Sequence, residues 1–270
     1  MFAGSAMAAD KDLGGPVETA PKQPEKTTAD RRLPTLWLIG DSTVRNGTKG
    51  QMGWGSVLSP HFDTNRITVV NRALGGRSSR TFLTEGLWQK VVDELRPGDF
   101  VLIQFGHNDG GPMDSGRARA SVKGSGEDTV TITNQTSGQI EVVHTYGWYL
   151  RRYITDAKAK GATPIVLSLV PRKIWKDDKI VRAADSYMLW ASEAANAEGV
   201  GFIDLNERVA AKYDQLSRDE VTALFADDHT HTNTEGAALS ATTVAEGIRA
   251  LPECPLAAYL RPDTEATPPR

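Results

Sequence analysis

Cysteine is almost absent from this sequence, because Cys254 is the only one among 270 residues. An intramolecular disulfide is therefore excluded, and cysteine usage does not indicate a redox compartment. Positive charge is not in excess either: 31 Lys and Arg stand against 34 Asp and Glu, for a formal net charge of −3. Nucleic acids and anionic membrane surfaces attract strongly basic proteins, so this balance argues against either as a partner.

Long hydrophobic runs are also missing, since no stretch reaches the roughly 20 apolar residues that a membrane-spanning helix needs. The composition, 39% hydrophobic and 24% charged, predicts one globular domain with a large core. Residues 1–32 and 261–270 are too rich in polar residues and proline to bury much surface, so we expect a disordered start, a flexible tail and a catalytic domain over 33–260. Two interpretations of residues 1–32 stay open: the remnant of a secretory signal, or a vector-derived remnant.

Between these ends, short apolar runs alternate with amphipathic stretches. The runs predicted to be buried strands cover residues 35–39, 67–71, 100–105, 163–169 and 200–204. The stretches with helical spacing cover about residues 82–95, 145–160, 181–198 and 233–250. This alternation predicts an α/β fold with a central five-stranded parallel sheet. By analogy we expect a flavodoxin-like three-layer sandwich with strand order 2-1-3-4-5.

One segment departs from this alternation. Residues 129–133 and 139–143 alternate apolar and polar side chains on either side of the polar turn 134–138, which predicts an inserted β-hairpin. The hairpin follows the third predicted strand directly, so we expect it outside the sheet, overhanging its carboxyl edge.

The motif GDSTV, residues 40–44, follows the first predicted strand without a gap. Open α/β sheets carry their ligand-binding groups at the carboxyl ends of strands, so Ser42 is a candidate nucleophile. A serine hydroxyl needs a base to take its proton and donors that stabilise the developing oxyanion. The alternative interpretation of this motif is a helix N-cap, which satisfies free backbone N–H groups.

A candidate base lies in DDHTHTN, residues 227–233. Asp228 and His231 are three residues apart, a spacing that on a turn allows the carboxylate to hold the second imidazole nitrogen. Asp227 with His229 lacks that spacing and ranks second. A zinc site that uses both histidines is the alternative, because His-x-His with carboxylates also binds zinc. We predict no metal, since a zinc site leaves the serine unexplained.

Two further strand ends supply candidate oxyanion donors. The segment NRALGGRS, residues 71–78, contains a glycine pair whose backbone N–H groups can approach a ligand closely. The segment GHND, residues 106–109, contains Asn108, whose side-chain amide is a neutral donor. We expect all these groups to meet at one edge of the sheet.

In this order the motifs GDSTV, NRALGGRS, GHND and DxxH resemble the four sequence blocks of the SGNH (GDSL) hydrolase superfamily. The longer stretches GGRSSRTF, GHNDGG, DDHTHTN and HTYGWYLRRYI resemble its rhamnogalacturonan acetylesterase-like group of carbohydrate esterases. The resemblance covers about residues 34–250. It implies that Ser42 is the nucleophile, Asp228 the acid and His231 the base.

The resemblance also implies an oxyanion hole made of the Ser42 N–H, the Gly76 N–H and the Asn108 side chain. Gly76 is preferred over Gly75 because the glycine of the family directly precedes an Arg-Ser pair. The hairpin insertion exceeds what a minimal member carries, which affects the expected shape of the substrate cleft rather than the chemistry.

The implied function is that of a serine esterase that removes acetyl groups from plant cell-wall polysaccharide, such as rhamnogalacturonan or other pectin, without a cofactor. Such a substrate implies an extracellular or periplasmic protein. An acetylxylan esterase and a GDSL lipase or lysophospholipase remain alternatives, because a fold does not fix a substrate. A non-catalytic carbohydrate-binding protein is the alternative of a different class. No G-x-S-x-G elbow is present, which argues against an α/β-hydrolase, and the sequence predicts no oligomeric state.

Three residues are candidate substrate contacts. Trp175 follows the fourth predicted strand and could stack on a sugar ring, with ordinary packing as the alternative. Arg77 and Arg80 could pair with the carboxylate of a galacturonic acid unit, because guanidinium groups suit carboxylates. Surface salt bridges explain these two arginines equally well.

Overall fold

The computed structural model describes residues 33–262. The expectations for residues 1–32 and 263–270 lie outside the described residues. Arg261, which we assigned to the tail, donates from its backbone N–H to His61 O and from its guanidinium to Phe62 O.

Five parallel strands form the central sheet. They are β1 (Thr35–Gly40), β2 (Thr68–Asn71), β3 (Phe100–Gln104), β6 (Thr163–Leu167) and β9 (Gly201–Ile203). Their order is β2-β1-β3-β6-β9, which confirms the predicted 2-1-3-4-5 arrangement. All six residues of β1 are buried, as expected for a strand with both sheet faces covered.

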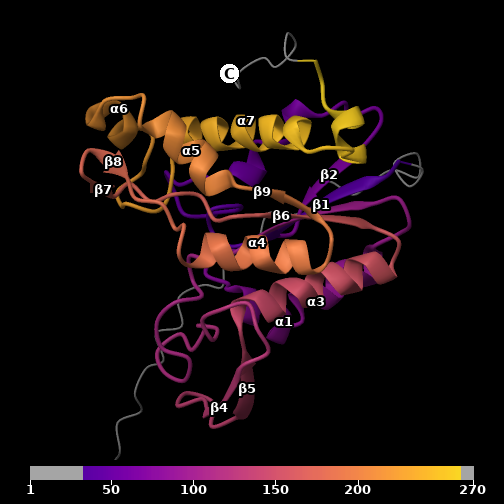
Figure 1. Cartoon of the computed structure of the whole chain (residues 1–270), viewed down its shortest axis with the longest axis vertical. Coiled ribbons are helices and arrows are strands. Elements are labelled where there is room, and N and C mark those ends of the chain that lie inside the picture. The colour runs from indigo at the N-terminus through magenta and orange to yellow at the C-terminus, as the bar shows by residue number, and fades with distance from the viewer. Residues whose placement is uncertain (1–32, 263–270) are drawn as a thin grey trace, which may run out of the picture.

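Helices cover both faces of the sheet (Figure 1). One face carries α1 (Ser79–Thr84), α2 (Leu87–Glu94), α3 (Tyr146–Ala159) and α4 (Tyr187–Ala197), and the other carries α5 (Leu205–Tyr213) and α7 (Thr234–Ala250). Successive side chains of β1 point to opposite faces. Leu36 and Leu38 accordingly join the core under α5 and α7, while Trp37 joins the core under α1 to α4.

The helices differ from the sequence prediction in three places. The predicted helix over 82–95 is two helices, because Gly86 adopts φ +70° between α1 and α2. The helix predicted from residue 181 begins at Tyr187, since a small hairpin, β7 (Trp175–Lys176) with β8 (Lys179–Ile180), and its return loop precede it. Helices α5 and α6 (Arg218–Ala223) were not predicted, although the capping box of Ser217 with Glu220 marks the start of α6.

The predicted insertion is present. Strands β4 (Thr129–Thr133) and β5 (Ile140–His144) pair antiparallel in a separate two-stranded sheet. Figure 1 shows this hairpin projecting away from the central sheet. Three short 3₁₀ helices, Trp54–Ser56, Ser59–His61 and Pro255–Tyr259, complete the described elements. None of the helices described between residues 33 and 262 has the length and apolar character needed to cross a bilayer.

Candidate active site

Ser42 lies on a tight turn at the carboxyl end of β1. The carbonyl of Asp41 accepts hydrogen bonds from the backbone N–H groups of Val44 and Arg45, both at 3.1 Å. The Asp41 carboxylate accepts from the Thr43 N–H at 2.8 Å and from the Thr43 hydroxyl at 2.7 Å. Asp41 therefore closes the turn, and the side chain of Ser42 is left free for another partner.

That partner is His231. Ser42 Oγ is 2.9 Å from His231 Nε2, and His231 Nδ1 is 2.6 Å from Asp228 Oδ2. The structure thus brings together three residues that are separated by as many as 189 positions in the chain. Hydroxyl, imidazole and carboxylate form one continuous hydrogen-bonded series, which is the geometry that transfers a proton away from a serine nucleophile. Asp228, rather than Asp227, holds the imidazole.

The second oxygen of Asp228 shapes the loop itself. Asp228 Oδ1 accepts from the backbone N–H groups of Thr230 at 2.6 Å and His231 at 2.7 Å. Partial burial acts to raise the pKa of Asp228, but the hydrogen bonds from His231 and Thr230 outweigh it and lower that pKa to about 2. The carboxylate therefore stays ionised throughout the range in which a histidine titrates.

The candidate oxyanion donors surround the serine. Leu74 O accepts from the Arg77 N–H, so Gly75 and Gly76 occupy the centre of a turn, and Gly76 has φ +80°, which favours glycine. A Cβ placed on Gly75 would lie 3.6 Å from Ser42 Cβ. The glycine pair therefore lies directly beside the candidate nucleophile.

Asn108 joins the site from the loop after β3. One N–H of its amide donates to Arg77 O at 2.8 Å, which ties this loop to the glycine turn. A side-chain amide has two N–H groups, so the second remains available. The backbone N–H groups of Ser42 and Gly76 likewise make no hydrogen bond to any residue of the described chain. Three donors are thus unused at one edge of the sheet.

A short segment before the first 3₁₀ helix connects the two loops that carry Ser42 and His231. Met52 and Thr232, the neighbour of His231, exchange two hydrogen bonds, at 2.8 and 2.9 Å. Two residues later, the Trp54 N–H donates to Thr43 O at 2.9 Å, beside Ser42. The distance between serine and histidine therefore depends on this segment, although sequence reasoning did not single it out.

A cavity of about 400 Å³ lies at the same edge of the sheet, next to the loops after β3 and β6. His107, Arg172, Asp185 and Tyr187 are among its lining residues. The backbone N–H of Lys173 donates to His229 O at 2.7 Å, so the loop that lines this cavity also contacts the loop of His231.

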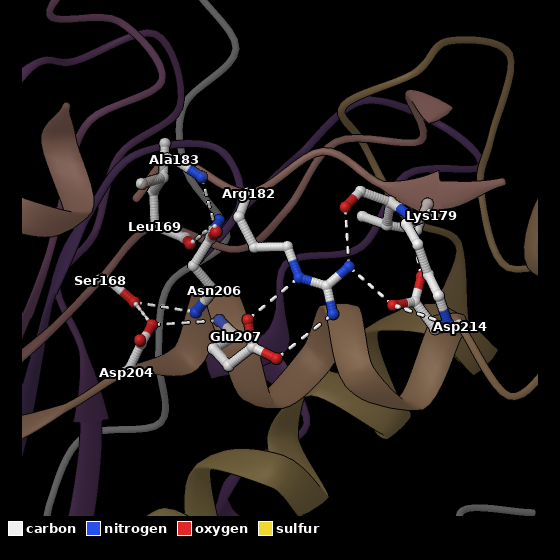
Figure 2. Close-up of polar contacts among 10 residues, drawn as sticks. Ser168, Leu169, Lys179, Arg182, Ala183, Asp204, Asn206, Glu207 and Asp214 are labelled. Carbon is white, nitrogen blue, oxygen red and sulfur yellow. Dashed lines mark hydrogen bonds and ion pairs between the residues drawn. The ribbon is translucent and has the colours of Figure 1, made fainter. Parts of the chain in front are cut away.

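Polar contacts hold the lining residues Arg182, Ala183 and Asn206 in place, and Figure 2 draws these contacts. Asn206 at the start of α5 donates to Leu169 O at 3.0 Å and accepts from the Ala183 N–H at 2.9 Å. Arg182 lies between Glu207 and Asp214, with ion-pair distances of 3.0 and 2.7 Å. The segment between β8 and α4 is held to α5 in this way, so the cavity has a defined shape.

The three substrate contacts that we expected from the sequence each have a partner within the protein. Arg80 is only 1% exposed, and its guanidinium is bound by the carboxylate of Glu141 at 2.6 and 2.7 Å and by the carbonyls of Met113 and Ala120. It is a structural group that connects α1 to the hairpin, with no free face for a ligand.

The other two expected contacts are also occupied. Arg77 is paired with Glu85 at 2.9 Å and donates to Gly75 O. The ring of Trp175 packs against the core and is covered by the guanidinium of Arg218, 5.4 Å from the ring centroid. Two other arginines, Arg117 and Arg119, lie beside Gly76 without a carboxylate partner in the described chain. They belong to a Gly-rich loop without periodicity, so no sequence signal distinguished them.

The described residues 33–262 contain no group of three or more His, Cys, Asp or Glu side chains arranged to hold a metal ion. His229, the partner of His231 in the alternative zinc site, uses its backbone carbonyl to accept from Lys173. The hydrogen-bonded groups at this edge are the serine, the imidazole and the carboxylate.

A parallel sheet with a serine, histidine and aspartate chain at its carboxyl edge is the arrangement of a hydrolase that uses a serine nucleophile. Comparison with known proteins gives the family: residues 38–239 match the GDSL-like Lipase/Acylhydrolase family, and the chain belongs to it. The protein is accordingly a carboxylic ester hydrolase.

Two relatives are similar over most of their length. A rhamnogalacturonan acetylesterase of Emericella nidulans is 33% identical over 79% of this chain and 84% of its own. A probable rhamnogalacturonan acetylesterase of Bacillus subtilis, YesY, is 32% identical over 80% of this chain and 93% of its own.

Solved structures share the fold. The protein YxiM of B. subtilis superposes with a TM-score of 0.65 at 24% identity over 80% of this chain, which spans only 56% of that longer protein. Axe2, an acetylxylan esterase of Geobacillus stearothermophilus, superposes with a TM-score of 0.55 at 17% identity over 79% of this chain and 93% of that one.

Proposed function

We propose that this protein removes acetyl groups from plant cell-wall polysaccharide of the rhamnogalacturonan or pectin type. The observation that carries the proposal is the unbroken series from Ser42 Oγ through His231 to Asp228, at 2.9 and 2.6 Å. The two acetylesterase relatives at 32 and 33% identity support the substrate class. The acetylxylan esterase neighbour supports acetylated polysaccharide more broadly and keeps xylan as the second candidate.

The proposed mechanism is acyl transfer. His231 Nε2 accepts the proton of Ser42 Oγ as the oxygen attacks the acetyl carbonyl. The negative charge on the carbonyl oxygen is stabilised by the Ser42 N–H, the Gly76 N–H and the free N–H of Asn108. His231 then protonates the departing sugar oxygen, which leaves as a hydroxyl group. Asp228 stabilises the imidazolium between these two proton transfers. Water, activated by His231 in the same way, hydrolyses the acetyl-serine and releases acetate.

The proposed site of action follows from the substrate. Plant cell-wall polymers are too large to enter a cell intact, so we propose that the protein acts outside the cytoplasm. We also propose residues 33–260 as the catalytic domain, because the candidate catalytic groups and both cores lie within them.

The test is acetate release from a panel of native acetylated polysaccharides: rhamnogalacturonan, homogalacturonan pectin and xylan. We expect the first two to be deacetylated most efficiently and Ser42→Ala to release no acetate above background. Ser56→Ala, on an exposed serine of the first 3₁₀ helix, is the matched control and should keep full activity. Turnover of acyl lipids with no release from any polysaccharide would overturn the proposal in favour of a lipase.

A further inference from the structure

Two arginine side chains lie over the glycine turn beside the serine. A Cβ placed on Gly76 would be 3.7 Å from Arg117 Nη1 and 3.9 Å from Arg119 Nη1. The same construction on Gly75 reaches Ser42 Cβ at 3.6 Å. Gly75 thus lies next to Ser42, and both guanidinium groups lie next to the following residue, Gly76. Both arginines belong to the loop that follows β3.

Neither arginine has an anionic partner. Within residues 33–262, no Asp or Glu oxygen lies within 4.0 Å of either guanidinium. Arg119 donates to Gly76 O at 3.0 Å, and Arg117 makes no hydrogen bond in the described chain. By contrast, Arg77 and Arg80 are both paired with carboxylates. Neither guanidinium beside the serine is therefore neutralised by a direct ion pair.

The two charges also oppose each other. Burial, and then the charge of Arg117, lower the pKa of Arg119. The carboxylates of Asp41 and Asp109 attract Arg119 from a distance, but their hydrogen bonds go to Thr43 and to Ser79 and Ser121. Two positive charges held close together without a direct ion pair attract a ligand that carries negative charge.

The backbone between the two arginines is strained. Ala118 adopts φ +44°, the left-handed region that costs an L-residue about 1–2 kcal/mol. Its side chain is buried, and its N–H donates to Ser115 O at 2.8 Å, so the surrounding structure holds this conformation in place. Strain of this kind concentrates at ligand-binding sites. The strained backbone and the two positive charges therefore both favour a ligand-binding site at this loop.

We infer that Arg117 and Arg119 form a carboxylate-binding subsite that holds a hexuronate unit of the substrate beside Ser42. The inference rests on the proposed function and adds the group that selects uronate-containing polymers over neutral ones. Guanidinium groups bind carboxylates through parallel, charge-assisted hydrogen bonds. In a hexuronate the carboxylate and the acetylated ring hydroxyls lie on opposite sides of one pyranose ring. One uronate unit therefore carries both an ester for Ser42 and a carboxylate for the arginines.

The experiment compares three substrates with Arg117→Ala, chosen because its guanidinium makes no bond within the described chain. They are an acetylated oligogalacturonate, the same oligomer with its carboxylates methyl-esterified, and 4-nitrophenyl acetate. A charge-assisted hydrogen bond contributes about 1.5–3 kcal/mol, so we expect kcat/KM on the first substrate to fall about 10- to 100-fold. Values on the other two should change less than about twofold. Arg117→Lys should retain part of the preference.

Arg208→Ala is the matched control, because Arg208 is an exposed arginine of α5 with no side-chain bond within the described chain. It should leave all three substrates unchanged. A second readout uses unacetylated oligogalacturonate as an inhibitor of 4-nitrophenyl acetate hydrolysis. Inhibition should be weaker for Arg117→Ala than for the unmodified protein, and it should weaken as salt screens the charges.

Two results overturn the subsite. One is an unchanged kcat/KM of Arg117→Ala on the acetylated oligogalacturonate, and the other is an equal loss on the methyl-esterified oligomer. Failure of the proposed function is distinguishable, because the unmodified protein would then release no acetate from any polysaccharide. In that case the inhibition assay still decides whether the arginine pair binds a uronate.

Discussion

Asn108 has two separate partners in the proposed reaction, and this allows a prediction at the scale of one residue. One amide N–H holds the Arg77 carbonyl at 2.8 Å, and the other is free to stabilise the oxyanion. Removing one oxyanion donor typically lowers kcat by about 10²–10³-fold. We expect Asn108→Ala to show a loss of this size on 4-nitrophenyl acetate, with little change in KM, because the donor acts mainly in the transition state.

The control for this prediction separates catalysis from folding. Asn65→Ala, at an exposed loop position, should keep full activity. A thermal unfolding curve of Asn108→Ala should stay cooperative, since the lost hydrogen bond contributes only about 1 kcal/mol to stability. If kcat falls less than about tenfold, the amide is not an oxyanion donor.

At the residue scale, the sequence predicted which side chains meet but not which are already occupied. The order and spacing of the motifs were sufficient to identify Ser42, Asp228 and His231. Arg77 and Arg80 looked equally available, yet both are paired with carboxylates, Glu85 and Glu141. Salt-bridge partners up to 61 positions away depend on tertiary packing, which local patterns do not contain.

At the element scale, the segment Met52–Gly55 matters because it positions both catalytic loops. Gly53 is packed so tightly that a Cβ there would lie 2.3 Å from the carbonyl carbon of Val44, on the turn of Ser42. Its backbone, at φ −90° and ψ 145°, suits any residue, so the constraint is purely steric. Gly53→Ala must therefore move either this segment or the serine turn.

We expect Gly53→Ala to lower kcat at least tenfold and to lower the unfolding free energy by about 1–3 kcal/mol, the usual cost of overpacking. Gly47→Ala is the matched control, because a Cβ at Gly47 meets nothing within 4 Å. Activity and urea unfolding of both variants check the prediction. Similar behaviour of the two would mean that the contact at Gly53 relaxes without moving Ser42.

The hairpin β4–β5 provides the second prediction at this scale. It is anchored through Glu141, whose carboxylate binds the buried guanidinium of Arg80. Glu141→Gln leaves that charge without its counterion. Breaking a buried pair costs about 3–5 kcal/mol, and the remaining carbonyl partners and the partial exposure of Glu141 should reduce the loss to about 2 kcal/mol.

Loss of this ion pair should also affect proteolysis and activity. Because Arg80 is structural, Glu141→Gln should increase proteolysis within residues 106–145 and lower activity on oligosaccharide and aryl acetate alike. Glu127→Gln, on the highly exposed partner of Arg151, is the control and should have little effect. A loss confined to uronate substrates would instead return Arg80 to the list of substrate contacts.

At the scale of the whole molecule, strand order was predictable because buried parallel strands have continuous apolar sequences. The ends of the helices were less predictable from the sequence. Residues 181–186 have helical spacing, yet Arg182 binds Glu207 and Asp214 and residues 184–186 form a turn, so that α4 begins only at Tyr187. Tertiary contacts overrode the local periodicity there.

Two buried groups next to each other, His107 and Asp109, should make the stability of the whole protein depend on pH in opposite ways. Burial lowers the pKa of His107 to about 4. Burial raises the pKa of Asp109 to about 6, although Ser79 and Ser121 donate to it. Each shift corresponds to about 3 kcal/mol at most.

The signs follow from which state binds more protons. Below pH 6.5 the unfolded histidine takes up a proton that folded His107 refuses, so His107 lowers stability as the pH falls towards 4. Folded Asp109 takes up a proton near pH 6, before the unfolded carboxyl does at 3.8, so Asp109 raises stability over nearly the same range. In the unmodified protein the two effects nearly cancel.

Single variants should separate these effects in urea unfolding measured from pH 7 to 4. Asp109→Asn keeps an acceptor for Ser79 but cannot titrate, so its stability should fall by up to about 3 kcal/mol relative to the unmodified protein as the pH drops. His107→Leu should show the opposite slope, a relative gain of similar size. Asp219→Asn, on the surface of α6, should run parallel to the unmodified protein. Parallel curves for all three variants would mean that neither buried group changes its proton affinity on folding.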